Sequence, residues 1–381
     1  MDCFNTPFGN YHLQPLHYHP KSPIQAWNAA DELVLMHLCE QNLEDAKIMV
    51  VNDAHGALMT SLHQYSPVSW NDSLNSKLAC QGNHQRNHLN WRESNWINSN
   101  NPPKGQYDYI LIKIPKSLAF LQYQLHWLRN CCHPNTVIFG AAMVKHLSSS
   151  MVDLFQKHIG NTETTLARKK ARLVLSRVDT NLETEAPAVV KYPLDGTQIQ
   201  LHNHPNVFSQ QKLDIGTRFL LQHFPKLNEG QVVIDLGCGN GALGCFAASR
   251  QPQAHILFCD DSHMALASAK SSWHANGFSN KAKFIASDAL SQIDEKADLI
   301  LCNPPFHQGS QIENQTPLRM FSQASDKLNP GGQLLVVGNR HLNYHHILKR
   351  YFKQVQLVAS NKKFVVLSAM ERKNAKKWSR Q

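Results

Sequence analysis

The sequence predicts an α/β protein with two doubly wound, largely parallel sheets. Short apolar segments of strand length alternate with longer segments of helical pattern along almost the whole chain, as expected when helices cover both faces of a sheet. The length of 381 residues fits about two domains. Several short motifs also occur once in each half and in the same order, which favours a duplicated domain.

In the first half, three expected strands are short apolar runs, the composition of strands buried on both faces, and the fourth is a basic strand. They cover residues 47–51, 107–114, 136–139 and 168–177, and the expected helices cover 26–39, 120–129 and 151–158. Residues 71–106 are rich in Asn, Ser, Gln and His, and we expect one helix and a long loop there. Residues 178–206 show no periodicity, so we place a boundary there, between domains 1–190 and 191–381.

In the second half, the alternation of strands and helices is more regular. The expected strands cover 232–235, 256–259, 283–286, 298–302, 333–337 and 364–369. The expected helices lie within 208–224, 242–249, 264–276, 316–328 and 345–352. Thr316 and Pro317 support the fourth of these helices, because threonine is a common N-cap and proline suits the first helical position.

The repeated motifs occupy equivalent places in the two halves. Gly56-Ala57-Leu58 matches Gly241-Ala242-Leu243, residues 107–111 match 297–301, and Lys169-Lys170 matches Lys362-Lys363. Two unrelated α/β domains could share such motifs through composition alone, but the kept order favours duplication.

Composition limits the class of protein. Hydrophobic residues make up 42% and charged residues 17% of the chain, which is typical of a folded protein. The net charge of +10 favours a polyanionic partner. The nine cysteines include no C-x-x-C pair, the 22 histidines show no metal-binding spacing, and no apolar run is long enough to cross a membrane. We therefore expect a cytoplasmic protein with reduced thiols, no bound metal and no membrane partner.

The stretch Asn303-Pro304-Pro305-Phe306 directly follows the expected strand 298–302. Neither proline can donate a hydrogen bond to a neighbouring strand, so the strand stops there and the stretch lies at the carboxyl edge of the sheet. Open α/β sheets bind ligands at this edge. A carboxamide, a peptide carbonyl on Pro304 and an aromatic ring suit a planar amine. A proline-rich exit from a strand, without chemistry, is the alternative for this stretch alone.

A second motif, Asp235-Leu236-Gly237-Cys238-Gly239-Asn240-Gly241, follows a strand and opens a helix. Its glycines let the backbone approach a cofactor, and the N–H groups of the helix start face an anionic group. Residues 239–244 also fit G-x-G-x-x-G, so the dinucleotide site of an NAD(P)-dependent oxidoreductase is an alternative. Two features oppose that alternative. Asp235 can meet a cationic amino-acid group, and hydride transfer has no need of the 303–306 motif. Asp260 suits a ribose diol, and Asp288 suits an adenine amine or only a helix cap.

With these motifs, the second half resembles class I S-adenosylmethionine-dependent methyltransferases that act on exocyclic amines. A degenerate first copy followed by an intact second copy is similar to the ribosomal RNA guanine-N2 methyltransferases. The chain length and residues 25–32 are most similar to members of that family that modify the large subunit. The resemblance implies two tandem Rossmann-like class I methyltransferase domains, the first degenerate, with S-adenosylmethionine as cofactor. It implies 23S ribosomal RNA, naked or partly assembled, as the partner of a monomer, with 16S ribosomal RNA as the alternative.

The resemblance also implies roles for residues. The Asn303 side-chain oxygen and the Pro304 carbonyl would accept the two hydrogens of guanine N2, and Phe306 would stack on the base. A base held in this way has to be unpaired or flipped out. The expected cofactor-binding residues are Asp235, Gly237, Cys238, Gly239, Asn240, Gly241, Asp260, Asp288 and Asn303.

The first copy lacks these features. Val50 stands where the second copy has Asp235, two of the three glycines are absent, and Lys113-Ile114-Pro115-Lys116 replaces the 303–306 motif. We expect this copy to bind no S-adenosylmethionine and to hold RNA. The candidate RNA-binding residues are Lys113, Lys116, Arg168, Lys169, Lys170 and Arg172. A purely structural first domain, and a non-catalytic RNA-binding protein, are the alternatives.

Overall fold

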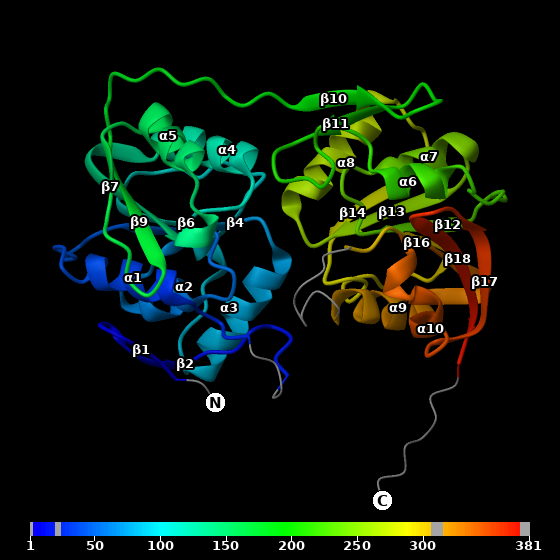
Figure 1. The fold of residues 1–381 in the computed structure, drawn as a ribbon, viewed down its shortest axis with the longest axis horizontal. Helices are drawn as coiled ribbons and strands as arrows, with labels where there is room; N and C mark the ends of the chain where they lie inside the picture. Colours follow the sequence, from blue (N-terminus) through cyan, green and yellow to red (C-terminus); the bar gives the residue numbers. More distant parts are fainter. Residues whose placement is uncertain (1–2, 20–23, 306–314, 374–381) are drawn as a thin grey trace, which may run out of the picture. The chain divides into compact units, whose positions relative to one another are not determined.

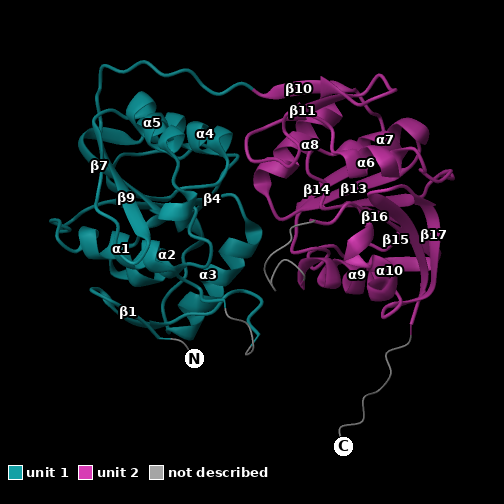
Figure 2. Cartoon of the chain, viewed as in Figure 1, with its two compact units in different colours: residues 1–188 teal, residues 189–381 magenta. Residues whose placement is uncertain are grey.

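The computed structural model describes residues 3–19, 24–305 and 315–373, and the chain forms two compact units, residues 1–188 and 189–381 (Figures 1 and 2). Within the described residues, each unit holds one seven-stranded sheet and one separate two-stranded hairpin. The α/β class expected from the sequence is confirmed. None of the helices in these ranges is both long enough and apolar enough to cross a membrane.

In the sheet of the second unit, six strands run in one direction and one strand runs in the opposite direction. Its strands are β12 (Val232–Leu236), β13 (His255–Asp260), β14 (Ala282–Ala286), β15 (Ala297–Cys302), β16 (Leu328–Asn339), β17 (Phe352–Ser360) and β18 (Phe364–Arg372). Their order is β14-β13-β12-β15-β16-β18-β17, and β18 runs antiparallel to both its neighbours. The chain changes direction across the sheet between β12 and β15, which is where sheets of this kind bind ligands.

Helices cover both faces of this sheet because strand residues point alternately to either side. The helices on one face are α6 (Ile215–Leu221), α7 (Ala242–Arg250) and α8 (His263–Ala275). Those on the other face are α9 (Gln315–Lys327) and α10 (Tyr344–Leu348). In β12, for example, Val233 packs with the first group and Ile234 with the second. A hairpin of β10 (Val190–Pro193) and β11 (Gln200–Asn203) precedes these elements.

The sheet of the first unit has the same strand order and directions. Its strands are β3 (Ile48–Val51), β4 (Val68–Asn71), β5 (Trp96–Asn98), β6 (Tyr107–Lys113), β7 (Cys132–Met143), β8 (Thr162–Thr164) and β9 (Ala171–Arg177), in the order β5-β4-β3-β6-β7-β9-β8. Helices α1 (Ala29–Leu38), α2 (Ala57–Ser61) and α3 (Leu74–Arg86) cover one face, and α4 (Leu118–Arg129) and α5 (Ser149–His158) cover the other. The hairpin consists of β1 (Cys3–Thr6) and β2 (Gly9–His12).

The start of several elements is also alike in the two units. Helices α2 and α7 both follow a glycine with left-handed backbone, Gly56 at φ 78° and Gly241 at φ 80°. Ser73 caps α3 and Ser262 caps α8, and each hydroxyl accepts a hydrogen bond from the N–H three residues later. The two units therefore share these helix starts as well as the strand order.

Differences from the sequence expectations concern polar edge strands, hairpins and the short interior strand β4. Strand β17 was not expected, because Phe352 alone among its residues is buried and the rest shows no apolar alternation. Neither hairpin was expected: β10 and β11 lie in the non-periodic segment 178–206, and no element was expected before residue 26. The strand expected at 168–177 begins only at Ala171, because Lys169 and Lys170 adopt positive φ angles in the preceding turn.

Candidate active site

The glycine loop of the second unit lies between β12 and α7. Gly237, Gly239 and Gly241 have φ angles of 70°, 52° and 80°, a left-handed region that favours glycine. A side chain at Gly239 would meet no described atom within 4 Å of its Cβ. The loop backbone is therefore tightly turned and open on the side of Gly239.

Asp260 ties this loop to the next strand. Its Oδ2 accepts a hydrogen bond from the Gly239 N–H at 2.9 Å, and its Oδ1 accepts one from the Ser262 N–H at 3.0 Å. The structure thus brings together two elements that the sequence assigned to one cofactor site. The carboxylate ends β13 at the carboxyl edge of the sheet.

Asp235 lies beneath the loop and is 1% exposed. Its Oδ2 accepts a hydrogen bond from the Gly244 N–H at 2.8 Å, so it holds the first turn of α7. Burial raises the pKa of Asp235 to about 8, the Gly244 N–H opposes this, and the nearby Asp260 adds to the rise. Binding of the cofactor's amino-acid group by Asp235 stays a prediction.

Two expected cofactor residues have side chains that are buried in the unit. The Asn240 Nδ2 donates to the Tyr192 hydroxyl at 2.9 Å and to Asn203 Oδ1 at 2.8 Å, both in the β10–β11 hairpin. Cys238 is buried, and burial raises the pKa of its thiol. If Asn240 and Cys238 contact a cofactor, they do so through their backbone.

Asp288 follows β14 and is paired with an arginine that the sequence reading missed. Arg319 of α9 reaches Asp288 Oδ1 through Nε at 3.1 Å and through Nη2 at 2.9 Å. The carboxylate is largely buried, with 8% of the side chain exposed. Such a pair fixes the position of Asp288, and its expected contact with an adenine amine stays a prediction.

Asn303 directly follows β15, whose last residue, Cys302, pairs with Leu236 at the end of β12. The register therefore places Asn303 beside the glycine loop. The Asn303 Nδ2 donates to Asp214 Oδ2 at 3.0 Å and to Thr217 Oγ1 at 2.8 Å. The Asn303 Oδ1 is buried, and no described residue donates to it.

The rest of this motif is only partly described. Pro304 is buried and Pro305 is exposed. Phe306 lies outside the described residues, so its expected stacking on a base stays a prediction. The sequence reading also missed Asp214 and Thr217. An aspartate directly ahead of an apolar helical run is the N-cap signal that could have found Asp214, whereas no local signal points to Thr217.

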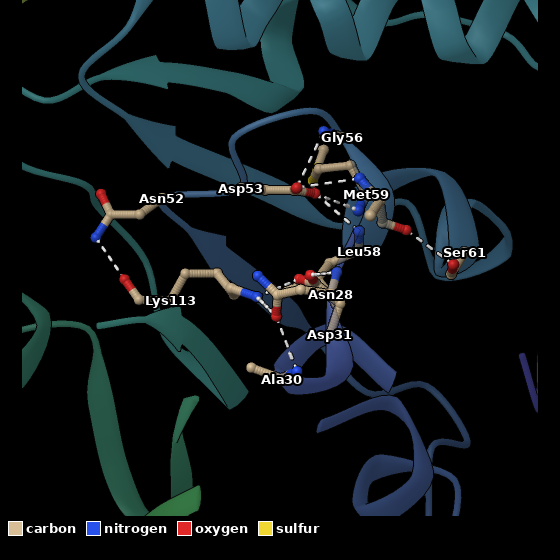
Figure 3. Close-up of polar contacts among 11 residues, drawn as sticks. Asn28, Ala30, Asp31, Asn52, Asp53, Gly56, Leu58, Met59, Ser61 and Lys113 are labelled. Carbon is tan, nitrogen blue, oxygen red and sulfur yellow. Dashed lines mark hydrogen bonds and ion pairs between the residues drawn. The ribbon is translucent and has the colours of Figure 1, made fainter. Parts of the chain in front are cut away.

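In the first unit, the equivalent loop is filled by its own carboxylate (Figure 3). Asp53 is 2% exposed and accepts hydrogen bonds from four consecutive N–H groups at 2.8–3.0 Å, those of Gly56, Ala57, Leu58 and Met59. Burial is the main reason why the pKa of Asp53 rises to about 6. The register pairs Val50 with Leu111 and Asp235 with Leu301, so Val50 matches Asp235 as expected. The sequence reading did not foresee that Asp53 supplies the missing carboxylate.

Lys113 is engaged within its own unit. Its Nζ forms an ion pair with Asp31 Oδ1 at 2.6 Å, with side-chain exposures of only 17% and 6% (Figure 3). The same Nζ lies 3.4 Å from Asn28 Oδ1. The ion pair gives Lys113 a structural partner, and its predicted contact with RNA stays a prediction.

The other candidate RNA-binding residues are more exposed. Lys116, Arg168, Lys169 and Lys170 are exposed, whereas Arg172 is half-buried with its Nε buried. Lys169 forms an ion pair with Glu32 at 2.6 Å.

Exposed basic side chains also gather at the short 3-10 helix Val144–His146. The pKa of His146 is lowered by partial burial and then by the charges of Lys145 and Lys116. The strands that precede these residues, β6 and β7, are paired as far as Lys113 and Ala141. The Val144 N–H donates to the Lys170 carbonyl, which brings the turn before β9 to the same place. We call Lys116, Lys145, His146, Arg168 and Lys170 the basic edge.

Two family descriptions match the chain. They are RLMG N-terminal domain over residues 1–180 and Methyltransferase small domain over residues 198–368. Three proteins named ribosomal RNA large subunit methyltransferase G are similar to it over nearly its full length. The one from Ectopseudomonas mendocina is 42% identical and covers 97% of this chain and 100% of its own. Those from Yersinia enterocolitica and Streptomyces griseus are 41% and 39% identical, covering 91% and 98% of this chain and 89% and 100% of their own.

Among solved structures, a T. thermophilus 16S rRNA N2 guanine methyltransferase, in complex with AdoMet and guanosine, is similar over both units. It covers 97% of this chain and 98% of its own, with a TM-score of 0.76 and 20% sequence identity. At this identity the similarity shows the fold, which is the class I methyltransferase fold in the second unit.

Proposed function

The chain belongs to the ribosomal RNA large subunit methyltransferase G family, and we propose that its second unit methylates the exocyclic N2 amine of a guanine in 23S ribosomal RNA. The methyl donor is S-adenosylmethionine. The observation that carries this proposal is the buried Asn303 Oδ1 without a described donor. Leaving such an oxygen unpaired costs about 1–3 kcal/mol, which is explained if the site is built for a donor from outside the chain.

The glycine loop fits S-adenosylmethionine. A Cβ at Gly239 would meet no described atom within 4 Å, and the Asp260 carboxylate beside Gly239 would hold the ribose hydroxyls. Asp235 would bind the amino-acid group of S-adenosylmethionine, and Asp288 would bind its adenine amine. When bound, this cofactor supplies an electrophilic methyl group on a sulfonium.

Asn303 and Pro304 would act on the target amine. The amine lone pair of guanine is delocalised into the ring, so the amine is a weak nucleophile. Hydrogen bonds from its two hydrogens to Asn303 Oδ1 and to the Pro304 carbonyl favour the pyramidal nitrogen of the transition state. Because Asn303 Oδ1 is covered here, neighbouring groups have to move when the base enters. The base itself has to be unpaired or flipped out.

We also propose that the first unit is a duplicated and degenerate copy of the second. The shared strand order supports this, and so does the attachment of each hairpin. Asn87 exchanges two hydrogen bonds with the backbone of His12, and Asn276 does the same with Gln200. Such a detail is not required by an α/β fold, so its repetition favours common origin over chance.

The first unit would bind no S-adenosylmethionine. In its loop, the Asp53 carboxylate already occupies the N–H groups at the start of α2. A second anionic group would meet a negative charge rather than free donors. The Lys113–Asp31 pair stands where the second unit has Asn303 and Thr217, so the carboxamide that would grip an amine is absent as well.

The basic edge would instead contact RNA phosphates. Its exposed lysines and Arg168 lie at the carboxyl edge of the first sheet, where the Val144 N–H bonds the Lys170 carbonyl. The net charge of +10 suits a polyanion. We further propose that the protein acts as a monomer in the cytoplasm, without a membrane partner, on ribosomal RNA before or during assembly of the large subunit.

Mapping of modified guanines tests the proposed function. Cells without this protein should lack N2-methylation at one guanine of 23S ribosomal RNA, and the wild-type chain should restore it. Loss at a 16S position instead would assign the small-subunit alternative, which the similar T. thermophilus structure suggests. An unchanged pattern in both RNAs would refute the proposal.

A further inference from the structure

We propose that Asp214 and Thr217 are positioning residues that hold the Asn303 carboxamide with its oxygen toward the substrate amine. The inference rests on the proposed function of Asn303 and assigns the two residues that make this function possible. Neither residue is expected to touch the substrate.

Both residues belong to the start of α6. Asp214 is its N-cap, and its Oδ2 accepts a hydrogen bond from the Thr217 N–H at 2.8 Å. The Asn303 Nδ2 donates to the same Oδ2 and to Thr217 Oγ1. An amide nitrogen has two hydrogens, and both are therefore used. The carboxamide cannot turn over without losing both bonds, so its oxygen points the other way.

The charge of Asp214 adds to this orientation. An ionised carboxylate only accepts hydrogen bonds, so it selects the nitrogen end of the Asn303 carboxamide. A hydrogen bond to a charged acceptor is stronger than one between neutral groups. It also polarises the amide, which makes Asn303 Oδ1 a better acceptor when positive charge develops on the target nitrogen. Asp214 thus acts on the reacting amine through Asn303.

The first unit shows what the same positions do without the carboxamide. Asn28 caps α1, Asp31 is the third residue of that helix, and Lys113 ends β6. Lys113 Nζ reaches both Asp31 and Asn28. In both units, therefore, residues at the start of a helix bond the residue at the carboxyl end of the strand, β6 in the first unit and β15 in the second. Only in the second unit, whose glycine loop is intact, do described residues at this strand end place a carboxylate, Asp214, against a carboxamide, Asn303.

Two substitutions separate positioning from a merely structural role. Asp214→Asn removes the charge and keeps a residue that caps helices about as well as aspartate. At position 217, valine keeps the shape of threonine and loses the acceptor, whereas serine keeps the acceptor and loses the methyl group. A structural role predicts that Thr217→Val is the milder change, because Thr217 is buried. A positioning role predicts the opposite order.

The experiment measures kcat, the KM for RNA and the affinity for S-adenosylmethionine in the full chain. We expect Thr217→Ser to keep kcat near wild type, and Thr217→Val and Asp214→Asn each to lower it roughly tenfold or more. The affinity for S-adenosylmethionine should stay within about threefold in all three variants, since the bonds act on Asn303. Equal kcat for the serine and valine variants, or a loss of cofactor affinity that accounts for the loss of rate, would overturn the inference.

A double-mutant cycle adds a second readout. In an Asn303→Ala background, followed by single-turnover transfer of a labelled methyl group, Asp214→Asn should cause no further loss, because its partner is gone. Independent, additive losses would show that Asp214 acts elsewhere. Failure of the two hypotheses is distinguishable. Full activity of Asn303→Ala alone would refute the catalytic role proposed for Asn303, whereas an inactive Asn303→Ala with fully active Asp214→Asn would refute this inference only.

Discussion

Replacement of Lys113 by methionine tests whether this residue is structural. The change keeps the length of the side chain and removes the charge, so Asp31 loses its ion-pair partner. Asp31 is 4% exposed and keeps one described bond, from the Asn28 N–H at 2.8 Å. Lys113 also lowers the pKa of buried Asp53, after larger effects of burial and other groups. Its removal therefore leaves two buried carboxyl groups less well compensated.

The magnitude follows from the burial of the pair. Breaking a buried pair by removing one partner costs about 3–5 kcal/mol. Because Lys113 is 17% exposed and Asp31 keeps its bond to Asn28, we expect about 2–4 kcal/mol. Lys113→Met combined with Asp31→Asn removes both charges, and we expect it to recover most of that loss. Lys169→Met is the matched control, since its pair with Glu32 has exposures of 67% and 31% and should be worth less than about 0.5 kcal/mol.

Urea unfolding followed by tryptophan fluorescence is a suitable assay. Five of the seven tryptophans lie in residues 1–188, so the signal reports mainly on the first unit. If Lys113→Met and Lys169→Met lose the same small amount, the pair is solvated and the structural role is wrong. If the losses of Lys113→Met and Asp31→Asn simply add, the two side chains do not act as a pair.

Three further predictions concern the acids, the basic edge and the cofactor. The pKa of folded Asp235 is raised to about 8 from an ordinary 3.8, so the folded state holds the proton more tightly and stability falls as the pH rises toward 8. From pH 6 to pH 8 the free energy of unfolding of the second unit should fall by up to about 3 kcal/mol, and Asp235→Asn should make this fall smaller. An equal fall in the wild type and in Asp235→Asn would contradict this prediction. Combined Arg168→Ala and Lys170→Ala should make the binding constant for RNA depend less steeply on salt, with the slope of log K against log salt falling by roughly one per lost phosphate contact. Lys113→Met should leave this slope unchanged. The reverse pattern would support RNA binding by Lys113. Calorimetry should give one S-adenosylmethionine per chain, because Asp53 fills the first loop; two per chain would refute the degeneracy of the first unit.

The residues at the carboxyl edge of the second sheet could be predicted from the sequence, because their position depends on residues next to them in the chain. Pro304 and Pro305 end β15, so Asn303 has to lie at the carboxyl edge. Gly241 begins α7 in a backbone conformation that favours glycine. Together these local signals placed Asn303 beside the glycine loop.

Partners of these residues could not be read in the same way, because they are distant in sequence. Lys113 and Asp31 are 82 positions apart, and Asn303 and Asp214 are 89 apart. A cation next to a strand end suits phosphate as well as a buried carboxylate, and only the fold decides between them. Asp53 was missed for another reason: it stands three residues after Val50, and the loop geometry alone turns its carboxylate toward α2.

Methyl transfer by Asn303→Ala is the most direct test of the central claim. Labelled S-adenosylmethionine and 23S ribosomal RNA are incubated with the wild type, with Asn303→Ala and with Asn228→Ala as an exposed control, and cofactor affinity is measured in parallel. We predict N2-methylguanine with the wild type and the control. Asn303→Ala should transfer at least about a hundredfold more slowly, with cofactor affinity within about 1–2 kcal/mol of the wild type. Undiminished transfer by Asn303→Ala would contradict the account.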